Sequence, residues 1–585
     1  MSSKTVTPPG PAPTPTSEAR PARAPARGGE GGAVAGREGT IAPRAAHLRP
    51  PPPANEPVLG YVPGSPERAE IRTTLQGMSA EEIEIPLIIG GEEVRTGQRV
   101  DVVMPHDHGH ILARAHRAGT EETHAAIEAA REAWREWSAW SWEDRAAVFL
   151  RAAELLAGPW RATLNAATML GQSKTVHQAE IDAACELIDF WRFNVHFASR
   201  LYEEQPESAP GQWNQLDHRP LEGFVYAITP FNFTSIGGNL PTSPAIMGNV
   251  SIWKPATTAI LSSYYIMRVL EEAGLPPGVI NFVPGDSAAM SEVLLASPEL
   301  AGIHFTGSTA TFQLLWRQVA ENLSDYRSYP RVVGETGGKD FIVAHASADP
   351  QALAVAVVRG AFEYQGQKCS AASRVYVPAN LWPEVRDRVG EMLSEIRVGD
   401  PADFQNFMAA VIDRSAFDSI TGYIEHARQS AETEIVFGGG FSDEVGYFID
   451  PTVVLAQDPG HRLMCEEIFG PVVTVHVYPE KRWEETLALV DATSPYALTG
   501  AVFAREGGAI RQAASALRHA AGNFYINDKP TGAVVGKQPF GGGRASGTND
   551  KAGSILNLLR WVSPRAIKET FAPPRDYRYP FLAAD

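Results

Sequence analysis

A cysteine at position 369 stands in a setting that suits chemistry. The stretch AFEYQGQKCSAASRVY at 361–376 places it between a helical pattern, which we expect Gly366 to end, and a strand pattern that ends at Pro378. Loops often carry reactive residues, and the neighbouring Lys368 favours the thiolate form. Because free cysteines are usually small buried hydrophobic residues, this context alone supports a packing role and a nucleophile about equally.

Two further polar residues lie in stretches that suit the chemistry of a carbonyl group. Asn232, in AITPFNFTSIGG at 227–238, follows a predicted strand that ends at Thr229, and ligands bind at such strand ends. Its amide could donate to an oxyanion, with a turn-forming asparagine as the alternative. Glu335 lies between glycines in RVVGETGGKD, a setting open enough for a general base, with an exposed turn glutamate as the alternative.

A nucleotide site would need an arrangement other than the commonest glycine loops. The sequence contains neither G-x-G-x-x-G nor G-x-x-x-x-G-K-[ST]. Lys254, at the end of the strand pattern in SIWKPATTA, could hold phosphate or ribose oxygens, although a lone lysine is usually a solvated charge. In AGIHFTGSTATFQLLWRQVA, Gly307 and Ser308 precede a helix whose N-terminus could bind an anion, and Ser308 could equally be an ordinary N-cap.

Composition bounds the class of protein. The chain has 585 residues, 44% of them hydrophobic, which is enough for two or three domains. Its formal charge of -17 argues against nucleic acid and anionic membranes as partners. Three distant cysteines make neither a disulfide framework nor a metal site, and they indicate a reducing compartment. No apolar run reaches the roughly 18 residues that cross a bilayer.

The first 54 residues differ from the rest. They hold 12 of the 45 prolines and no aromatic residue, so we expect a disordered tail. This segment would make a poor amphipathic mitochondrial presequence, which favours a cytoplasmic protein, or the mitochondrial matrix if the source is eukaryotic. From about residue 120, long helical patterns alternate with short apolar strands such as GFVYAIT and VINFVPG. This alternation predicts an α/β fold with parallel, doubly wound sheets.

Seven short motifs, taken together and in order, resemble the aldehyde dehydrogenase superfamily. Each is weak alone, but seven collinear motifs between residues 227 and 543 are specific, and they imply that Cys369 is the nucleophile. The motifs are Phe231-Asn232-Phe233, Lys254-Pro255, Phe305-Thr306-Gly307-Ser308, Glu335-Thr336-Gly337-Gly338-Lys339, Gly366-Gln367-Lys368-Cys369, Glu466-Glu467-Ile468-Phe469-Gly470-Pro471 and Pro539-Phe540-Gly541-Gly542.

Longer stretches are more similar to one branch, the delta-1-pyrroline-5-carboxylate dehydrogenases, which oxidise L-glutamate γ-semialdehyde to L-glutamate in proline degradation. An enzyme for another short semialdehyde would keep the same machinery. A CoA-acylating relative typically lacks the glutamate base, and a catalytically idle relative would lose Cys369 or Asn232. The stretches are EPVLGYVPGSPER at 56, AEIDAACELIDFWRFN at 179, GQKCSAASRVYVP at 366, AAGNFYINDKPTGAVVGKQPFGG at 520 and ASGTNDKAG at 545.

The resemblance also implies a domain plan. It implies a Rossmann-like NAD domain over 55–333, interrupted by a small β oligomerisation arm at about 201–219. A catalytic domain would follow over 334–545, and 546–585 would supply a C-terminal segment with a second strand of the arm. The expected partners are a small-molecule aldehyde and further copies of the chain, as a homodimer or a larger homo-oligomer.

The resemblance assigns roles residue by residue. Cys369 would attack the aldehyde, Asn232 would hold the oxyanion, and Glu335 would activate the water that hydrolyses the thioester. No metal is expected. The implied NAD contacts are Thr229, Lys254, Gly307, Ser308, Thr309, Ala310, Thr311, Glu467 and Phe469, and the implied substrate contacts are Ser370, Gly532, Ala533 and Phe540.

Two positions depart from the family pattern. Many members carry a glutamate three residues after the lysine, where it disfavours a 2′-phosphate; here the residue is Thr257, so we expect NAD to be preferred with only modest discrimination against NADP. In the loop that anchors the substrate, animal members have a serine after the glycine, and here Ala533 follows Gly532. Backbone N–H groups and Ser370 would then supply the donors. Cys185 and Cys465 are expected only to pack.

Overall fold

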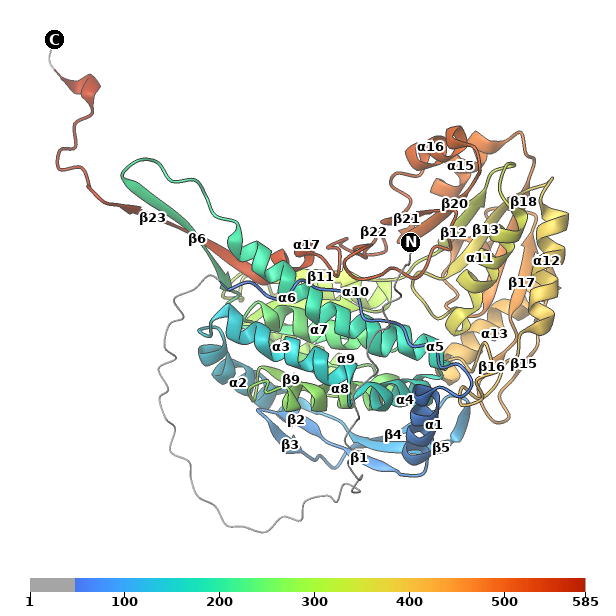
Figure 1. Cartoon of the computed structure of the whole chain (residues 1–585), viewed down its shortest axis with the longest axis horizontal. Helices are drawn as coiled ribbons and strands as arrows, with labels where there is room; N and C mark the ends of the chain where they lie inside the picture. Colours follow the sequence, from blue (N-terminus) through green and yellow to red (C-terminus); the bar gives the residue numbers. More distant parts are fainter. Residues whose placement is uncertain (1–47, 584–585) are drawn as a thin grey trace, which may run out of the picture. The chain divides into compact units, whose positions relative to one another are not determined.

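The computed structural model describes residues 48–583, which contain two seven-stranded sheets (Figure 1). The first sheet has the strand order β11-β10-β7-β8-β9-β2-β3, and all neighbours from β11 to β9 are parallel. Its strands are β2 Leu87–Ile89, β3 Glu92–Val94, β7 Phe224–Ile228, β8 Val250–Lys254, β9 Ile280–Phe282, β10 Leu300–Thr306 and β11 Arg331–Glu335. Strands such as β8 are buried on both faces, which explains their continuous apolar sequence.

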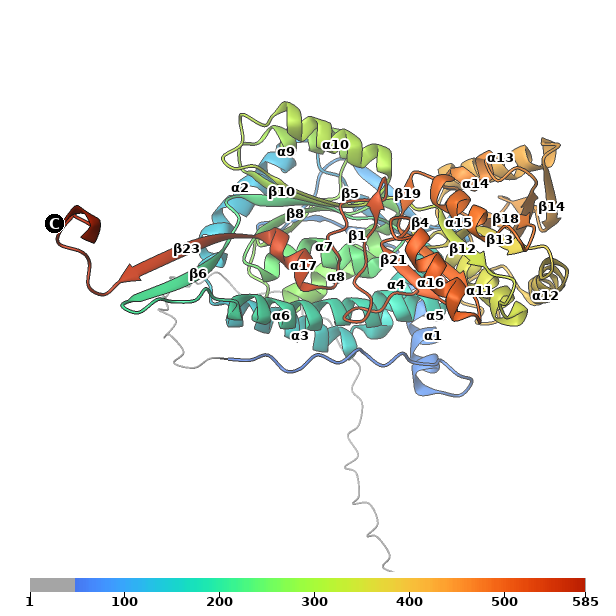
Figure 2. The same cartoon turned by 90° about the horizontal axis from the view of Figure 1, so that it is seen from above.

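Helices cover both faces of this sheet. In Figure 2, α9 and α10 lie on one side of the strands, and α7, α3 and α6 lie on the other. Several begin with a side-chain cap that the sequence supplies, such as Ser308 before α10 and Asp286 before α9. The helices are α2 Thr120–Trp137, α3 Trp142–Ala157, α4 Arg161–Gln172, α5 Val176–Ala179, α6 Leu187–Glu203, α7 Thr234–Ile246, α8 Ile260–Glu272, α9 Ser287–Ala296 and α10 Thr309–Glu321.

The second sheet has the order β14-β17-β18-β13-β12-β20-β21, parallel except for β14. Its strands are β12 Asp340–Ala344, β13 Ala372–Pro378, β14 Thr433–Phe437, β17 Thr452–Ala456, β18 Val472–Tyr478, β20 Thr499–Phe503 and β21 Asn523–Ile526. The helices that follow these strands are α11 Pro350–Phe362, α12 Trp382–Glu395, α13 Arg414–Gln429, α14 Arg462–Cys465, α15 Trp483–Ala492 and α16 Gly507–Ala516. The predicted α/β class with parallel sheets is confirmed.

Smaller elements complete the described part of the chain. Residues 48–62 form neither helix nor strand, and α1 and a three-stranded sheet of β1, β5 and β4 follow. The predicted disorder of residues 1–54 falls mostly on residues outside the described range. These elements are α1 Pro66–Ser79, β1 Ile83–Ile85, β4 Arg99–Met104, β5 Asp107–His116, β15 Phe441–Ser442, β16 Phe448–Ile449, β19 Tyr496–Ala497, β22 Gly543–Arg544 and α17 Ile555–Leu558.

A two-stranded antiparallel ribbon extends from the first sheet (Figure 2). It pairs β6 Gln212–Pro220 with β23 Val562–Thr570 over nine residue pairs. The arm was expected at about 201–219, but residues 201–203 still belong to α6, whose amphipathic pattern continues to Glu203.

The chain crosses between the two sheets beside the strand end that carries Glu335. Strand β11 ends at this residue, and β12 begins at Asp340 in the other sheet. A later segment returns to the crossing, where the backbone N–H of Thr336 donates to the carbonyl of Ser546 at 3.0 Å. The crossing therefore places residues from both sheets next to one another. Among residues 48–583, no helix combines the length and the apolar character needed to cross a membrane.

Candidate active site

A cavity of about 440 Å³ brings together six of the residues named from the sequence. Its wall is mainly apolar, with aromatic side chains such as Phe190, Phe233 and Phe305. Ligand sites commonly combine such a wall with a few polar groups. The predicted residues that line it are Glu335, Cys369, Ser370, Gly532, Ala533 and Phe540.

The loop before Cys369 has an unusual backbone. Helix α11 ends at Phe362 and not at Gly366, because Tyr364, Gln365 and Gly366 all adopt positive φ angles of 53°, 54° and 67°. The expected helix end was therefore wrong by four residues. The Gln365 side chain holds the turn by donating to the carbonyls of Ser173 at 3.0 Å and Ala410 at 2.8 Å. Positive φ angles in residues other than glycine are strained and persist only where the surrounding structure holds them. Here they direct the loop toward the cavity.

The Cys369 thiol is neutral in its present surroundings. Burial raises the pKa of the thiol well above its ordinary value, and the carboxyl groups of Asp340, Glu335 and Glu467 raise it further. These groups all disfavour a second negative charge nearby. A reactive thiolate at this position therefore needs a positive charge that binding brings in.

The neighbouring Lys368 does not supply that charge, contrary to the expectation from sequence. Its Nζ lies 3.1 Å from Glu363 Oε2, and both side chains are almost fully buried. This pairing neutralises the cation before it can act on the thiol. The sequence neighbour is therefore not the electrostatic partner, because Glu363, five residues earlier, lies within ion-pair distance of the Lys368 ammonium.

Asn232 lies directly beside the cysteine loop. Its Nδ2 donates to the Gln367 carbonyl at 3.1 Å, and only 3% of the residue is exposed. An amide carries two N–H groups, so one remains for a ligand after this bond is made. The side chain comes from the turn between β7 and α7, at the carboxyl end of a parallel strand.

A buried ion pair fixes the helix that follows Asn232. Asp182 accepts the first two backbone N–H groups of α7, at 2.9 and 3.0 Å, and pairs with Lys174 Nζ at 2.7 Å. The same ammonium lies 4.4 Å from the Phe233 ring centroid and 4.3 Å from that of Tyr364. One buried cation thus contacts both the turn that carries Asn232 and the loop that leads to Cys369.

Glu335 is a buried carboxyl group with one unsatisfied oxygen. Its Oε2 accepts the Gly542 N–H at 3.2 Å, while Oε1 has no hydrogen-bond partner within the described chain. Burial raises the pKa of Glu335 well above its ordinary value, and the Gly542 N–H and the Lys551 charge offset part of that rise. Glu335 ends β11 and does not sit in a loop, so the strand fixes its position. A carboxyl group with a raised pKa beside a thiol can serve as a general base.

A second group of predicted residues lies at the carboxyl ends of three adjacent parallel strands, outside the cavity lining just described. Thr229 follows β7, Lys254 ends β8, and Gly307 follows β10. Open α/β sheets bind ligands at this edge. Lys254 is 7% exposed, burial lowers its pKa to about 8, and it forms no ion pair among residues 48–583. Such a buried amino group fits the oxygen atoms of a ribose or a phosphate.

Helix α10 begins at the same edge of the sheet. Ser308 caps it by accepting the Thr311 N–H at 3.2 Å, so the expected N-cap is confirmed. The Thr309 hydroxyl donates to the Ala545 carbonyl at 3.3 Å, and Ala310 and Thr311 lie exposed on the first turn. The free N–H groups of this turn fit a pyrophosphate. A side chain at Gly307 would meet the Phe305 ring at 2.7 Å, so the backbone there stays open.

Glu467 and Phe469 are the remaining two residues predicted to contact NAD. Glu467 Oε1 accepts the Gly338 N–H at 2.8 Å, and burial raises the pKa of its carboxyl group to about 7. Phe469 has a φ of 58°, and its ring packs edge-on against Phe231 with centroids 5.8 Å apart. Glu467 thus lies near enough to Cys369 to act on its thiol, and Phe469 contacts the turn that carries Asn232.

The four predicted substrate residues line the same cavity as Cys369 and Glu335. The Ser370 and Thr531 hydroxyls lie 2.8 Å apart, and the following residues 532 and 533 line the cavity with no side-chain hydroxyl of their own. Gly532 has a φ of 97°, which only glycine adopts readily, and this turns the loop toward the cavity.

Comparison with known proteins identifies the family. The family model described as "Aldehyde dehydrogenase family" matches residues 93–565, most of the chain. The chain belongs to the aldehyde dehydrogenase family. The predicted resemblance is therefore confirmed, and it accounts for the α/β architecture with two parallel sheets.

Individual aldehyde dehydrogenases are also similar over most of their length. "Delta-1-pyrroline-5-carboxylate dehydrogenase, mitochondrial" of Bos taurus is 53% identical over 530 residues, which are 90% of this chain and 94% of the relative. The crystal structure of "Delta-pyrroline-5-carboxylate dehydrogenase from Mycobacterium tuberculosis bound with NAD" shares 56% identity with a TM-score of 0.90, over 92% of this chain and all of the other. An NAD-bound 1-pyrroline-5-carboxylate dehydrogenase from Thermus shares 33% identity with a TM-score of 0.84, over 90% and 100% of the two chains.

Sequence reasoning missed several polar residues of this aldehyde dehydrogenase site. Glu186 lines the cavity, accepts the Ser235 hydroxyl at 3.0 Å, and has its pKa raised to about 8 by burial. Lys529 lines the cavity and donates to the Thr531 carbonyl at 2.9 Å. Asn55 reaches it from a segment that is far away in sequence. For Glu186 the only signal was a charge within the apolar helical run ACELIDF.

The remaining cysteines were expected only to pack, and one of them, Cys185, also lines the cavity. Cys185 is buried and Cys465 partly buried, and both are free thiols. Cys185 lies 3.5 Å from a nitrogen of Arg161, in a polar network described below. Within residues 48–583, no group of three or more His, Cys, Asp or Glu side chains is placed to hold a metal ion.

Proposed function

We propose that the chain oxidises L-glutamate γ-semialdehyde, the open form of 1-pyrroline-5-carboxylate, to L-glutamate with NAD. The observation that carries this proposal is that Cys369 and Glu335, from two sheets, line one cavity, while Asn232 donates to the Gln367 carbonyl in the loop that leads to Cys369. The names of the relatives at about 50% identity support the substrate, and the NAD-bound structures of similar enzymes support the cofactor.

The first step is formation of a bond between the Cys369 sulfur and the aldehyde carbon. The thiol must lose its proton, and its raised pKa makes this the step that most needs help from a bound positive charge. The carbonyl oxygen then becomes an oxyanion. The free N–H of the Asn232 amide and the Cys369 backbone N–H hold that oxyanion while the carbon is tetrahedral.

When bound, NAD would supply the acceptor for the hydride that leaves the tetrahedral carbon, which becomes the carbonyl carbon of a thioester on Cys369, and it would bring a positively charged nicotinamide ring. Lys254 would hold the adenosine ribose, the first turn of α10 the pyrophosphate, and Glu467 the nicotinamide ribose. Phe469 would pack beside the ring. Thr229, Gly307 and residues 309–311 would form the rest of this edge.

The second step is hydrolysis of the thioester that remains on Cys369. Glu335 would take a proton from water, and the resulting hydroxide equivalent attacks the acyl carbon. Its unpartnered Oε1 leaves an acceptor free for that water. The C–S bond then breaks, Cys369 leaves as the thiolate, and the product acid carries an oxygen atom from the water.

The part of the cavity lined by Ser370 and residues 529–533 would hold the carboxylate group of the substrate. Ser370, the backbone of Gly532 and Ala533, and Lys529 supply donors, and Phe540 supplies an apolar wall. A dehydrogenase for another short semialdehyde stays as the second candidate, because Ala533 replaces the expected hydroxyl contact.

We also propose the domain plan and the assembly. Residues 55–333 would bind NAD and residues 334–545 would carry the catalytic thiol, with the ribbon of β6 and β23 as an oligomerisation arm. An isolated two-stranded ribbon is marginally stable in water, so a second copy of the chain would stabilise it as a homodimer or a larger homo-oligomer. Discrimination against NADP would be modest, because Thr257 carries no negative charge.

The test compares NADH formation from glutamate semialdehyde and from succinate semialdehyde. We expect kcat/KM to be higher for glutamate semialdehyde, and we expect Cys369→Ala to abolish both reactions while NAD still binds. A higher kcat/KM for succinate semialdehyde would favour the second candidate. Turnover of Cys369→Ala near the wild-type rate would overturn the proposed nucleophile.

A further inference from the structure

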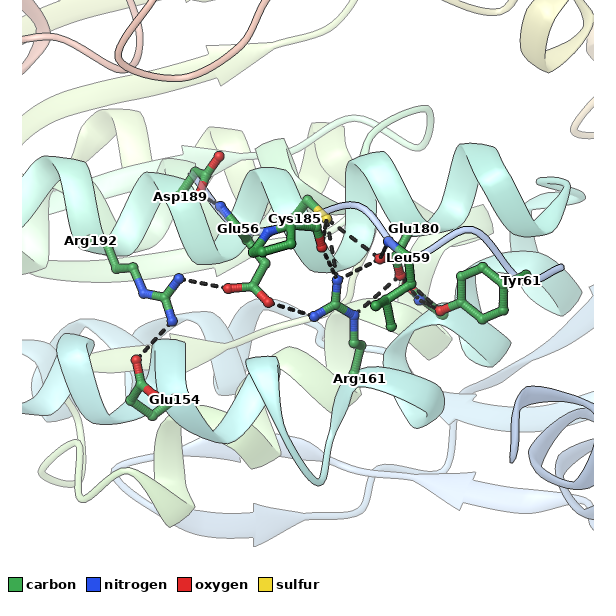
Figure 3. A network of polar contacts seen from close by, with 11 residues as sticks. Glu56, Leu59, Tyr61, Glu154, Arg161, Glu180, Cys185, Asp189 and Arg192 are labelled. Carbon is green, nitrogen blue, oxygen red and sulfur yellow. Dashed lines mark hydrogen bonds and ion pairs between the residues drawn. The ribbon is translucent and has the colours of Figure 1, made fainter. Parts of the chain in front are cut away.

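Residues 55–61 form an irregular segment that we call the strap. Figure 3 shows its residues Glu56, Leu59 and Tyr61 lying against helices that carry Arg161, Glu180 and Arg192. The strap has neither helix nor strand, so it has no regular backbone partner. It also lies outside residues 93–565, the part of the chain that matches the family model.

Side chains take the place of a strand partner. The backbone N–H of Glu56 donates to Asp189 Oδ1 at 2.7 Å, and that of Leu59 donates to Glu180 Oε1 at 2.8 Å. The Tyr61 hydroxyl donates to the other oxygen of Glu180 at 2.8 Å. Buried backbone groups need such partners, so these bonds fix the strap at defined points.

A bridged ion pair holds the middle of the strap. The Glu56 carboxylate contacts Arg161 Nη1 at 2.6 Å through one oxygen and Arg192 Nη1 at 2.7 Å through the other (Figure 3). Only 11% of the Glu56 side chain is exposed. Arg161 also pairs with Glu180, and Arg192 also pairs with Glu154. Each strap contact is therefore part of one network that spans α3, α4 and α6.

The strap is also a wall of the active-site cavity. Asn55, Glu56 and Val58 line the same cavity as Cys369 and Glu335. The strap therefore bounds the space that a bound aldehyde can fill, and its position sets how far that space extends.

Asn55 connects the strap to the loop that surrounds the far end of the cavity. Its Nδ2 donates to Asp189 Oδ2 at 2.7 Å and to the Val535 carbonyl at 2.8 Å. Both amide protons are thus used, one on α6 and one on the loop. This loop, residues 529–537, carries Gly532 and Ala533. The position of the loop therefore depends on the strap.

We propose that the strap is a specificity-determining wall that limits the length of the aldehyde, and that Asn55 and Glu56 are its positioning residues. With the Glu56 ion pairs intact, the strap closes one side of the cavity and holds the 529–537 loop against the substrate. Without them, the cavity opens on that side and accepts longer chains. The proposal deepens the proposed function, on which it rests for the aldehyde substrate.

The kinetic test uses Asn55→Ala and Glu56→Ala with propanal, hexanal and glutamate semialdehyde. We expect the hexanal-to-propanal ratio of kcat/KM to rise about 10-fold, since a few methylene contacts discriminate by that order. We also expect KM for glutamate semialdehyde to rise several-fold with kcat within about two-fold of wild type, because the strap holds the substrate and does not touch the thiol. An unchanged ratio, or an equal loss for all three aldehydes, would overturn the proposal.

The matched control is Glu154→Ala. Glu154 belongs to the same network through Arg192, but its side chain is 72% exposed and its ion pair does not involve the strap. We expect this variant to keep the wild-type ratio. A shift equal to that of Glu56→Ala would mean that the network acts through helix stability and not through the strap.

A second readout does not depend on catalysis. Cys185 is 5% exposed, and its Sγ lies 3.7 Å from the Pro57 carbonyl of the strap. In a Cys369→Ala background, we expect Asn55→Ala and Glu56→Ala to speed alkylation of Cys185 by a small maleimide about 10-fold, measured by peptide mass spectrometry. Asn55→Ala keeps all the ion pairs, so it remains informative if Glu56→Ala does not fold. An unchanged alkylation rate in a folded Asn55→Ala would count against the strap.

The two proposals fail in different ways. If wild-type protein oxidises alkanals but not glutamate semialdehyde, the proposed substrate is wrong, while the hexanal-to-propanal ratio still tests the strap. If glutamate semialdehyde is oxidised well and the ratio does not move in the variants, the strap proposal alone is wrong.

Discussion

Two buried glutamates close to the cavity have opposite electrostatic properties. Glu335 keeps one oxygen without a partner within the described chain, and burial raises its pKa well above the ordinary value. Glu180 is more fully buried from solvent, yet its pKa is lowered, because hydrogen bonds and the charge of Arg161 outweigh the effect of burial. The Glu180 carboxylate also accepts hydrogen bonds from the Leu59 N–H, the Tyr61 hydroxyl and the Asn165 amide.

The difference shows that partners, more than burial, separate a reactive carboxyl group from a structural one. Glu180 has all the donors it needs, so its charge is stable and its position is fixed. Glu335 lacks them, so it can accept a proton from water at little cost in lost bonds.

The largest expected effect is on Glu335. We expect Glu335→Gln to reduce steady-state kcat by roughly 10²- to 10⁴-fold, the usual contribution of a general base. The first turnover should still release about one NADH per site, because only thioester hydrolysis needs the base. Stopped-flow and steady-state measurements of NADH separate the two phases. If both phases fell equally, Glu335 would act before hydride transfer.

Glu180→Gln should have the reverse effect: it should lower the stability of the protein and leave catalysis largely unchanged. It leaves Arg161 with only Glu56 as a charged partner, and removing one member of a buried ion pair costs about 3 kcal/mol. We expect the free energy of unfolding to fall by about this amount, measured by urea titration, with kcat for propanal within about two-fold of wild type. Glu154→Gln, at the exposed end of the network, is the control and should change stability by less than about 1 kcal/mol. A loss of kcat without a loss of stability would make Glu180 a catalytic group.

The two glutamates should also respond to pH in opposite ways. The pKa of Glu180 is lowered in the fold, so its contribution to stability is present above its ordinary pKa and is lost as pH falls through the lower folded value. The pKa of Glu335 is raised, so steady-state kcat should increase as pH rises through that higher value. Urea titrations and kcat, each measured across pH in wild type and in the matching glutamine variant, test both. In Glu335→Gln, kcat should no longer increase with pH in this range. If the pH profile of kcat kept its shape, the increase would belong to another titrating group.

The smallest effect is expected from a new carboxylate at an exposed position. Such a group would be neither buried like Glu335 nor held by donors like Glu180. Thr257 is exposed in the short turn after β8, close in sequence to Lys254. We expect Thr257→Glu to raise the NAD-to-NADP ratio of kcat/KM about 10-fold, through repulsion of the 2′-phosphate. Thr257→Gln, of similar size without charge, is the control. An unchanged ratio would show that Thr257 does not face the ribose.

The regular elements could be read from the sequence because their signals are local. Continuous apolar runs gave β7 and β8, and the Ser308 cap gave the start of α10. The α/β class and the family were predicted and are confirmed. The gathering of Cys369, Asn232 and Glu335 followed only from the resemblance, because no local pattern relates residues that are 34 to 137 positions apart.

What could not be predicted depends on side-chain direction across the fold. Lys368 was expected to favour the thiolate, but it pairs with Glu363 across a stretch that contains three residues with positive φ angles. Asn55 was placed at the very start of the ordered chain, and nothing in its sequence indicates that it reaches Val535. Such contacts join segments through tertiary packing, which a single sequence does not report.

The position of Glu335 at the end of β11 affects the order in which the enzyme loses its activities under denaturing conditions. The proposed base belongs to one sheet and the thiol to the loop before β13 of the other, joined by a crossing of four residues, 336–339. A small rotation between the sheets would separate base and thioester while every strand remains paired. Under mild denaturant, hydrolysis should therefore stop first and leave the acyl group trapped on sulfur, before any loss of circular dichroism.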